Sequence, residues 1–152
     1  MKLLDKVNIA WGAFTTLMTA LLGEYWFLFL SFLVLNIVDY VTGLIKARMY
    51  GVESSAIGAK GIVKKVSYWI VVGIAFFMAF CFAQMGDIIQ IDLSFMPILG
   101  WFTLATYIIN ELRSILENCV QMGITVPSYL TKGLDVASRV IADRTGGANG
   151  QD

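Results

Sequence analysis

The sequence predicts an all-α, multi-pass (polytopic) membrane protein. Its 152 residues are 58% hydrophobic and only 14% charged, and the mean hydropathy is +0.74, which is too apolar for a soluble domain of this length. The apolar residues gather in four segments, and about twenty such residues cross a hydrocarbon core of about 30 Å. We therefore expect about four hydrophobic helices, three strong and the N-terminal one weaker, followed by a C-terminal cytoplasmic amphipathic helix.

The N-terminal element, residues 1–25, is the weakest of the four. Lys2 and Lys6 precede its apolar stretch at residues 7–22, as in a secretory signal, but the residues that follow make a poor cleavage site. We expect the segment to be retained as a helix that either spans the membrane or lies in its interface. Small residues follow one face of this helix, as in closely packed membrane helices: Gly12, Thr16, Ala20 and Gly23.

Residues 26–118 form the expected membrane core, with apolar segments at 26–45, 66–85 and 95–115. The connection at 46–65 is predicted to be a basic loop, and the positive-inside rule places it in the cytoplasm. The opposite connection carries Asp87 and Asp92 without a basic residue. Both termini are also predicted to be cytoplasmic, because four spans place on that side the basic residues near the two ends of the chain: Lys2, Lys6, Lys132, Arg139 and Arg144.

Residues 119–145 are predicted to contain the cytoplasmic helix. Pro127 suits the first position of a helix, since its missing N–H would be unpaired there anyway. Leu130, Leu134, Ala137 and Ile141 then share one face, so we expect this helix to pack on a neighbour. The last segment, residues 146–152, is rich in Gly and is predicted to be disordered.

Tryptophan and tyrosine residues near the ends of the apolar segments are expected at the membrane interfaces, where such rings are enriched. They are Trp11, Tyr25, Trp26, Tyr50, Tyr68, Trp69 and Trp101.

Two apolar segments carry polar stripes at helical spacing, and these are the candidate pore or oligomer-interface residues. Two interpretations remain open: the charged groups are buried pairs that fix helix register, or they line an aqueous path in an oligomer. Basic partners for Asp39 and Glu111 are available in Lys46, Lys64, Lys65 and Arg113. The stripes are Asn36, Asp39, Thr42, Gly43 and Lys46 on the second segment, and Tyr107, Glu111, Ser114 and Asn118 on the fourth, beside Arg113 and Glu117.

The third segment carries small residues at four-residue spacing, Ala75, Ala79 and Ala83. Together with the small residues of the first segment they favour close helix packing and homo-oligomerisation.

Composition argues against enzymes and nucleic-acid binders. The chain has no histidine, its net charge is zero, and its two cysteines lie at different predicted depths. We expect no catalytic residue, no metal and no cofactor. Gly58, Gly61, Lys64 and Lys65 lack the order of a phosphate-binding loop, so we interpret the glycines as a turn and the lysines as contacts for anionic lipid headgroups.

Four motifs in order resemble the toxin-secretion and phage-lysis holin family over about residues 30–135. They are the segments at 39–47, at 54–65, at 107–118 and at 123–127. The matched positions are Asp39, Thr42, Gly43, Lys46, Lys64, Lys65, Glu111, Ser114, Glu117 and Asn118.

The resemblance implies a small protein that accumulates in the bacterial cytoplasmic membrane, oligomerises and forms lesions. An endolysin or a toxin then leaves the cell through these lesions, leading to lysis. The implied partners are other copies of the chain, membrane lipid and the exported protein. Two alternatives stay open on the residues alone: a small ion channel or transporter subunit, and a membrane adaptor that recruits a cytosolic partner.

Overall fold

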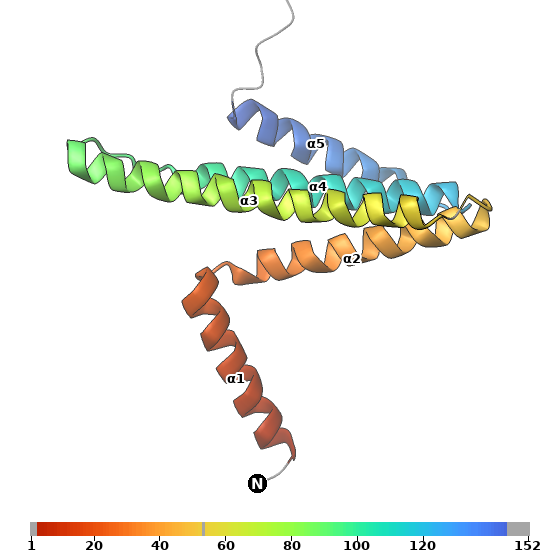
Figure 1. Cartoon of the computed structure of the whole chain (residues 1–152), viewed down its shortest axis with the longest axis horizontal. Helices are drawn as coiled ribbons and strands as arrows, with labels where there is room; N and C mark the ends of the chain where they lie inside the picture. The colour runs from red at the N-terminus through yellow and green to blue at the C-terminus, as the bar shows by residue number, and fades with distance from the viewer. Residues whose placement is uncertain (1–2, 53, 146–152) are drawn as a thin grey trace, which may run out of the picture.

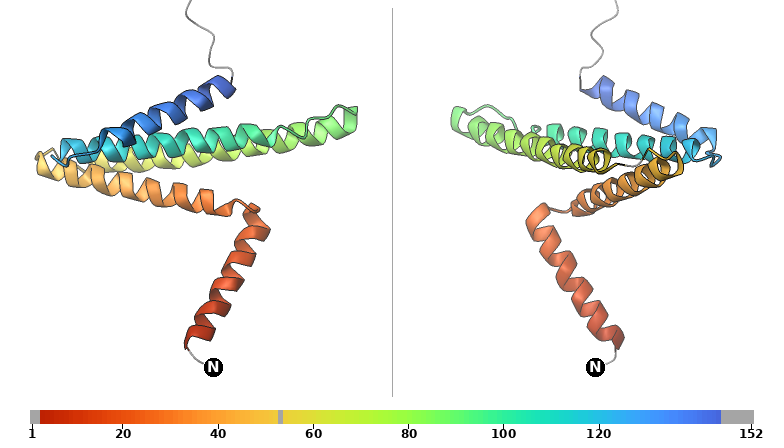
Figure 2. Two further views of the ribbon diagram at one scale, coloured as in Figure 1. Left: turned by 180° about the vertical axis from the view of Figure 1, so that it is seen from behind. Right: turned by 45° about the vertical axis from the view of Figure 1, so that its right-hand side comes forward.

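The computed structural model describes residues 3–52 and 54–145, which form five helices and no strand. The predicted disordered tail at 146–152 lies outside the described residues. Three helices, α2 (Trp26–Met49), α3 (Ser55–Ile89) and α4 (Pro97–Gln121), lie side by side and are called the three-helix bundle below (Figure 1). Helix α5 (Ser128–Arg144) packs along α4, whereas α1 (Leu3–Leu22) projects away from the bundle, as both views in Figure 2 show.

Among the described residues, α2 and α3 are the helices whose length and apolar composition allow them to cross a membrane. Their outward faces expose large apolar side chains, including Leu33 and Ile37 on α2 and Ile70 and Ile74 on α3. An apolar surface that continues along two long helices is unusual for a protein in water and is suited to lipid. Helix α4 is less apolar because its second half carries Glu111 and other polar residues.

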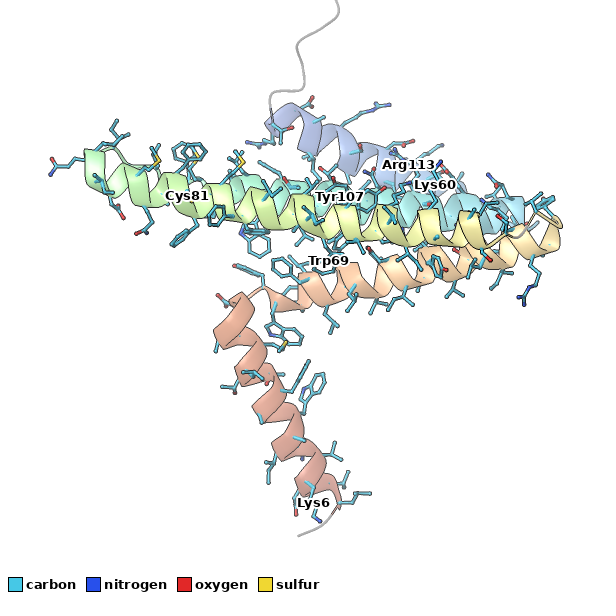
Figure 3. The ribbon with its side chains drawn as sticks, viewed as in Figure 1. Lys6, Lys60, Trp69, Cys81, Tyr107 and Arg113 are labelled. Carbon is cyan, nitrogen blue, oxygen red and sulfur yellow. The ribbon has the colours of Figure 1, made fainter. Side chains whose placement is uncertain are left out.

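The centre of the three-helix bundle is aromatic. Phe32, Val72 and Leu104, one from each helix, are almost completely buried. Trp69 packs on Phe32 with 4.9 Å between ring centroids, and Figure 3 shows it between α2 and α3. Trp101 packs at the far end of the core. Tyr68, Trp69 and Trp101, which are expected at the membrane interfaces, are partly buried and pack against this core.

Helix α3 begins earlier than the sequence predicted. Ser54 caps it by accepting the backbone N–H of Ile57 at 3.2 Å, so the segment at 46–65 is helical at both ends. Gly58 and Gly61 lie inside α3 against the ring of Tyr40, where an added Cβ would come within 3.4 Å. The interpretation of these glycines as a turn is therefore wrong; they let α3 approach α2 closely.

The connection from α3 to α4 folds back along α3. The backbone N–H of Ile91 donates to the carbonyl of Gly86 at 2.9 Å, which leaves no room for a side chain at Gly86. The backbone N–H of Ser94 donates to Asp92 at 3.0 Å, and this bond lowers the pKa of the Asp92 carboxyl, so the connection stays negatively charged.

The two stripes of small residues have different surroundings. Ala79 is buried inside the bundle, with Ala75 and Ala83 partly buried on either side of it along α3. The α3 stripe therefore packs within one copy of the chain. The α1 stripe, which consists of Gly12, Thr16, Ala20 and Gly23, is exposed.

Helices α1 and α5 leave the bundle through glycine turns. Gly23 has a φ of +81° and Gly123 a φ of +83°, values that residues with a side chain rarely adopt. Phe14 of α1 contacts the ring of Trp26 edge-on at 5.6 Å. Helix α5 begins directly after Pro127 and turns its partly buried Leu134 and Ile141 toward α4. The prediction that the C-terminal helix packs on a neighbour is confirmed.

Candidate functional site

Lys65 of α3 joins the two acidic residues of the polar stripes. Its Nζ donates to Asp39 Oδ2 of α2 at 2.5 Å and also to Glu111 Oε2 of α4. Glu111 is only 2% exposed, and Asp39 and Lys65 are 13% and 14% exposed. One ammonium group therefore ties all three helices of the bundle together through two carboxylates that are largely removed from solvent.

Asn118 extends this arrangement along α4. Its Nδ2 donates to Asp39 Oδ1 and to Thr42 Oγ1, both at 3.2 Å, and its Oδ1 accepts from Lys46 Nζ at 2.7 Å. Gly43 faces the same amide, because a Cβ there would lie 3.8 Å from Asn118 Nδ2. We call the linked residues the charge network: Asp39, Thr42, Lys46, Lys65, Glu111 and Asn118.

The helical period explains why these residues meet. Asp39, Thr42 and Lys46 recur at three and seven residues along α2, and Glu111 and Asn118 are seven residues apart on α4, so each set lies on one face. The two faces point toward one another because the rest of α2 within the membrane core is almost entirely apolar. An isolated intramembrane acid is costly in free energy, and pairing lowers that cost.

A layer of aromatic rings separates the charge network from the apolar core. Tyr107 precedes Glu111 by one turn and stacks on Tyr68, with 4.4 Å between ring centroids. The ammonium groups of Lys64 and Lys65 lie 5.7 Å and 5.8 Å from the centroid of the Tyr68 ring, within cation–π range. Tyr68 was not among the candidate site residues, although it follows the two lysines by about one helical turn.

Asn36 lies on the core side of Asp39 and is 4% exposed. Its Nδ2 donates to the carbonyl of Phe32 at 2.8 Å. Within residues 3–52 and 54–145, its Oδ1 is the buried side-chain oxygen or nitrogen that has no hydrogen-bond partner. An unpaired buried amide oxygen costs free energy and is best satisfied by water.

The structure places Arg113 and Glu117 outside the charge network. Arg113 faces α5, where its Nη2 lies 3.3 Å from Asp135 Oδ1 in an exposed ion pair, and Figure 3 shows it on the α5 side of α4. Glu117 is exposed and lines the apolar groove between α4 and α5. Arg113 thus pairs with the C-terminal helix and Glu117 faces it, and neither residue belongs to the charge network.

A groove of about 560 Å³ opens beside the charge network, between the end of α2, the start of α3 and the end of α4. Lys46, Lys64, Lys65 and Asp39 line it together with Ser114. Tyr50 closes one end, where its hydroxyl donates to the carbonyl of Gln121 at 2.5 Å. No group of three or more acidic or cysteine side chains suited to a metal ion occurs in the part of the chain that the structure describes.

The chain is similar to known proteins over most of its length. The profile of the bacteriophage holin family matches residues 16–138. A probable holin of Bacillus phage phi105 is 34% identical over 129 residues, which cover 83% of this chain and 87% of that protein. No solved structure matches the chain.

Bacterial proteins are similar too. An uncharacterised protein of Halalkalibacterium halodurans is 35% identical over 117 residues, covering 76% of this chain and 82% of that protein. An uncharacterised 14.9 kDa protein of Clostridium perfringens is 33% identical over 128 residues, covering 83% and 89%. The resemblance inferred from the four motifs is thus confirmed, the apolar helices are those of a membrane protein, and this chain belongs to the bacteriophage holin family.

Proposed function

We propose that this chain acts as a holin: copies assemble in the bacterial cytoplasmic membrane and form lesions through which an endolysin or a toxin leaves the cytosol. The observation that carries the proposal is the charge network, a set of acids, lysines and amides enclosed between three helices with apolar outer faces. Membership of the holin family and the similarity to a probable phage holin support it.

The proposed topology follows from charge and length. Helices α2, α3 and α4 each cross the membrane, and the turn between α2 and α3 faces the cytoplasm because basic residues surround it. The C-terminus then lies on the cytoplasmic side, and α1 as a fourth crossing places the N-terminus on that side too. About twenty residues of α3 from Val66 onward match a hydrocarbon core of about 30 Å, so Lys65 lies at its cytoplasmic boundary with Asp39 and Glu111 beside it.

In this proposal the closed protomer is the resting state. Its ion pairs let it accumulate in the bilayer without presenting carboxylates to lipid. Exposing these groups to hydrocarbon is costly, so the helices separate only where another subunit or water replaces the lost partners. Separation turns the polar faces of α2 and α4 toward a common aqueous opening. Asn36, with its unpaired oxygen, gains a water partner there.

Induced expression in a bacterium that makes a cytosolic endolysin tests the proposal. A potential-sensitive dye and culture turbidity are recorded together. A lesion wide enough for a folded enzyme predicts abrupt depolarisation followed by wall degradation. Depolarisation without wall degradation would instead support a narrow ion channel and reject the holin role.

The charge network is tested in the same assay with Glu111→Leu. We expect lysis to begin earlier, at a lower amount of protein, because a hydrogen bond to a charged group contributes about 1.5–3 kcal/mol and its loss favours the open arrangement about tenfold or more. Glu117→Leu is the matched control, since Glu117 lies on the same helix outside the network. Equal onset for Glu111→Leu, Glu117→Leu and the unmodified chain would contradict the mechanism.

A further inference from the structure

The groove beside the charge network contains more positive charge than its acids neutralise. Three lysines line it, Lys46, Lys64 and Lys65, against the two carboxylates of Asp39 and Glu111. Both carboxylates pair with Lys65. Among the described residues of the groove and its ion pairs, one net positive charge remains.

Lys46 and Lys64 are the groove lysines for which no direct ion pair with a described carboxylate is seen. Lys46 donates to a neutral amide oxygen, Asn118 Oδ1. Lys64 is exposed and lies near the Tyr68 ring. Within the part of the chain that the structure describes, neither ammonium group contacts a carboxylate. The groove therefore offers two cations to an anionic ligand.

The remaining surface of the groove suits a ligand with an apolar part. Leu44, Ala47, Val52 and Ile57 line it alongside the lysines. Lys64 and Lys65 directly precede the apolar run that begins at Val66. A group held by these lysines thus lies at the level where a bilayer places its phosphates.

We propose that this groove binds a phosphate group, with Lys64 and Lys46 as its direct contacts, and that an anionic phospholipid headgroup supplies it. The ammonium groups hold the phosphate oxygens, and the apolar wall holds the start of the acyl chains. Lys65 offsets part of the negative charge of Asp39, to which it donates a hydrogen bond, and the ligand contacts the other two lysines. The site needs neither assembly nor lysis activity.

Lipid binding to the full chain tests the site. The purified protein is placed in nanodiscs of phosphatidylcholine with a small fraction of fluorescent phosphatidylglycerol, and binding is followed by energy transfer from the chain's tryptophans. Lys64→Gln is expected to weaken binding about fivefold, the factor that corresponds to about 1 kcal/mol per lysine near a membrane surface. Lys64→Arg, which keeps the charge, is expected to restore it.

Lys60→Gln is the matched control, because Lys60 is an exposed lysine of the same helix that does not line the groove. An equal loss for Lys60→Gln and Lys64→Gln, or no loss for Lys64→Gln, would overturn the proposal. Inorganic phosphate added at millimolar concentration distinguishes the sources of the ligand. If inorganic phosphate fails to displace the fluorescent lipid, the site binds the lipid headgroup. If inorganic phosphate displaces the lipid and Lys64→Gln abolishes this competition, the site also accepts free phosphate. Either result supports a phosphate site.

Discussion

Replacing Lys65 by methionine is expected to destabilise the three-helix bundle by about 3–5 kcal/mol, the usual cost of removing one partner of a buried ion pair. Lys65 is the one described cation that touches both Asp39 and Glu111. Its loss leaves two carboxylates close together without the lysine that pairs with both. The change is measured as reversible unfolding in mixed micelles of dodecyl maltoside and SDS, followed by circular dichroism.

A neutral triple variant separates charge imbalance from lost packing. Asp39→Asn, Lys65→Met and Glu111→Gln together remove all three charges, and replacing a whole buried ion group by neutral residues is often near neutral for stability. We expect the triple variant to recover most of the loss. Lys60→Met, on the exposed face of α3, is expected to change stability by less than about 0.5 kcal/mol. A Lys65→Met protein as stable as the unmodified chain would show that the acids do not depend on this lysine.

Gly86→Ala is expected to destabilise the chain by about 1–3 kcal/mol, the range for overpacking a filled site. A Cβ there would lie 2.6 Å from the carbonyl oxygen of Ile91 and 3.0 Å from Leu93 Cβ. The contact is with backbone, so no rotation of a side chain relieves it. The returning connection must move away from α3, and its hydrogen bond to Gly86 is lost.

Gly73→Ala is the control for this effect. Gly73 also lies inside α3, but an added Cβ meets nothing within 4 Å. Alanine there is expected to be neutral or to stabilise the helix by up to about 1 kcal/mol, as helix propensity predicts. The same micelle titration compares the two variants. If Gly86→Ala matched Gly73→Ala, the close packing of residues 90–96 on α3 would be incorrect.

The helices and the polar stripes could be predicted from the sequence because both depend on local periodicity. Asp39 and Lys46 share a face of α2 by spacing alone, and so do Glu111 and Asn118 on α4. That these faces meet within one copy, through Lys65, depends on how three helices pack. The structure shows the pairs within one copy, and the aqueous path in an oligomer is the proposal made above.

The sequence pattern is ambiguous where one residue type serves two purposes. Trp69 and Trp101 fit an interfacial belt as well as a core, and only their contacts with Phe32 and Phe76 assign them to the core. Gly58 and Gly61 suggested a turn, yet their three-residue spacing continues the helical period of α3 toward Lys64 and Lys65. This helical spacing was the feature of the sequence that could have placed the two glycines inside α3, where they contact Tyr40.

The central claim is that Asn36, on the core side of the charge network, is closed to water in the resting protomer and faces the opening after assembly. Asn36→Cys, in a chain whose Cys81 and Cys119 are replaced by serine, tests it directly. A membrane-impermeant thiol reagent is added to cells before and after the onset of lysis. Ile37→Cys is the control, because Ile37 is 55% exposed on the lipid-facing side of α2.

The account predicts that Asn36→Cys is protected before onset and reacts afterwards, while Ile37→Cys stays unreactive throughout. Reaction of Asn36→Cys before onset, or its continued protection in cells that have begun to lyse, would contradict the account.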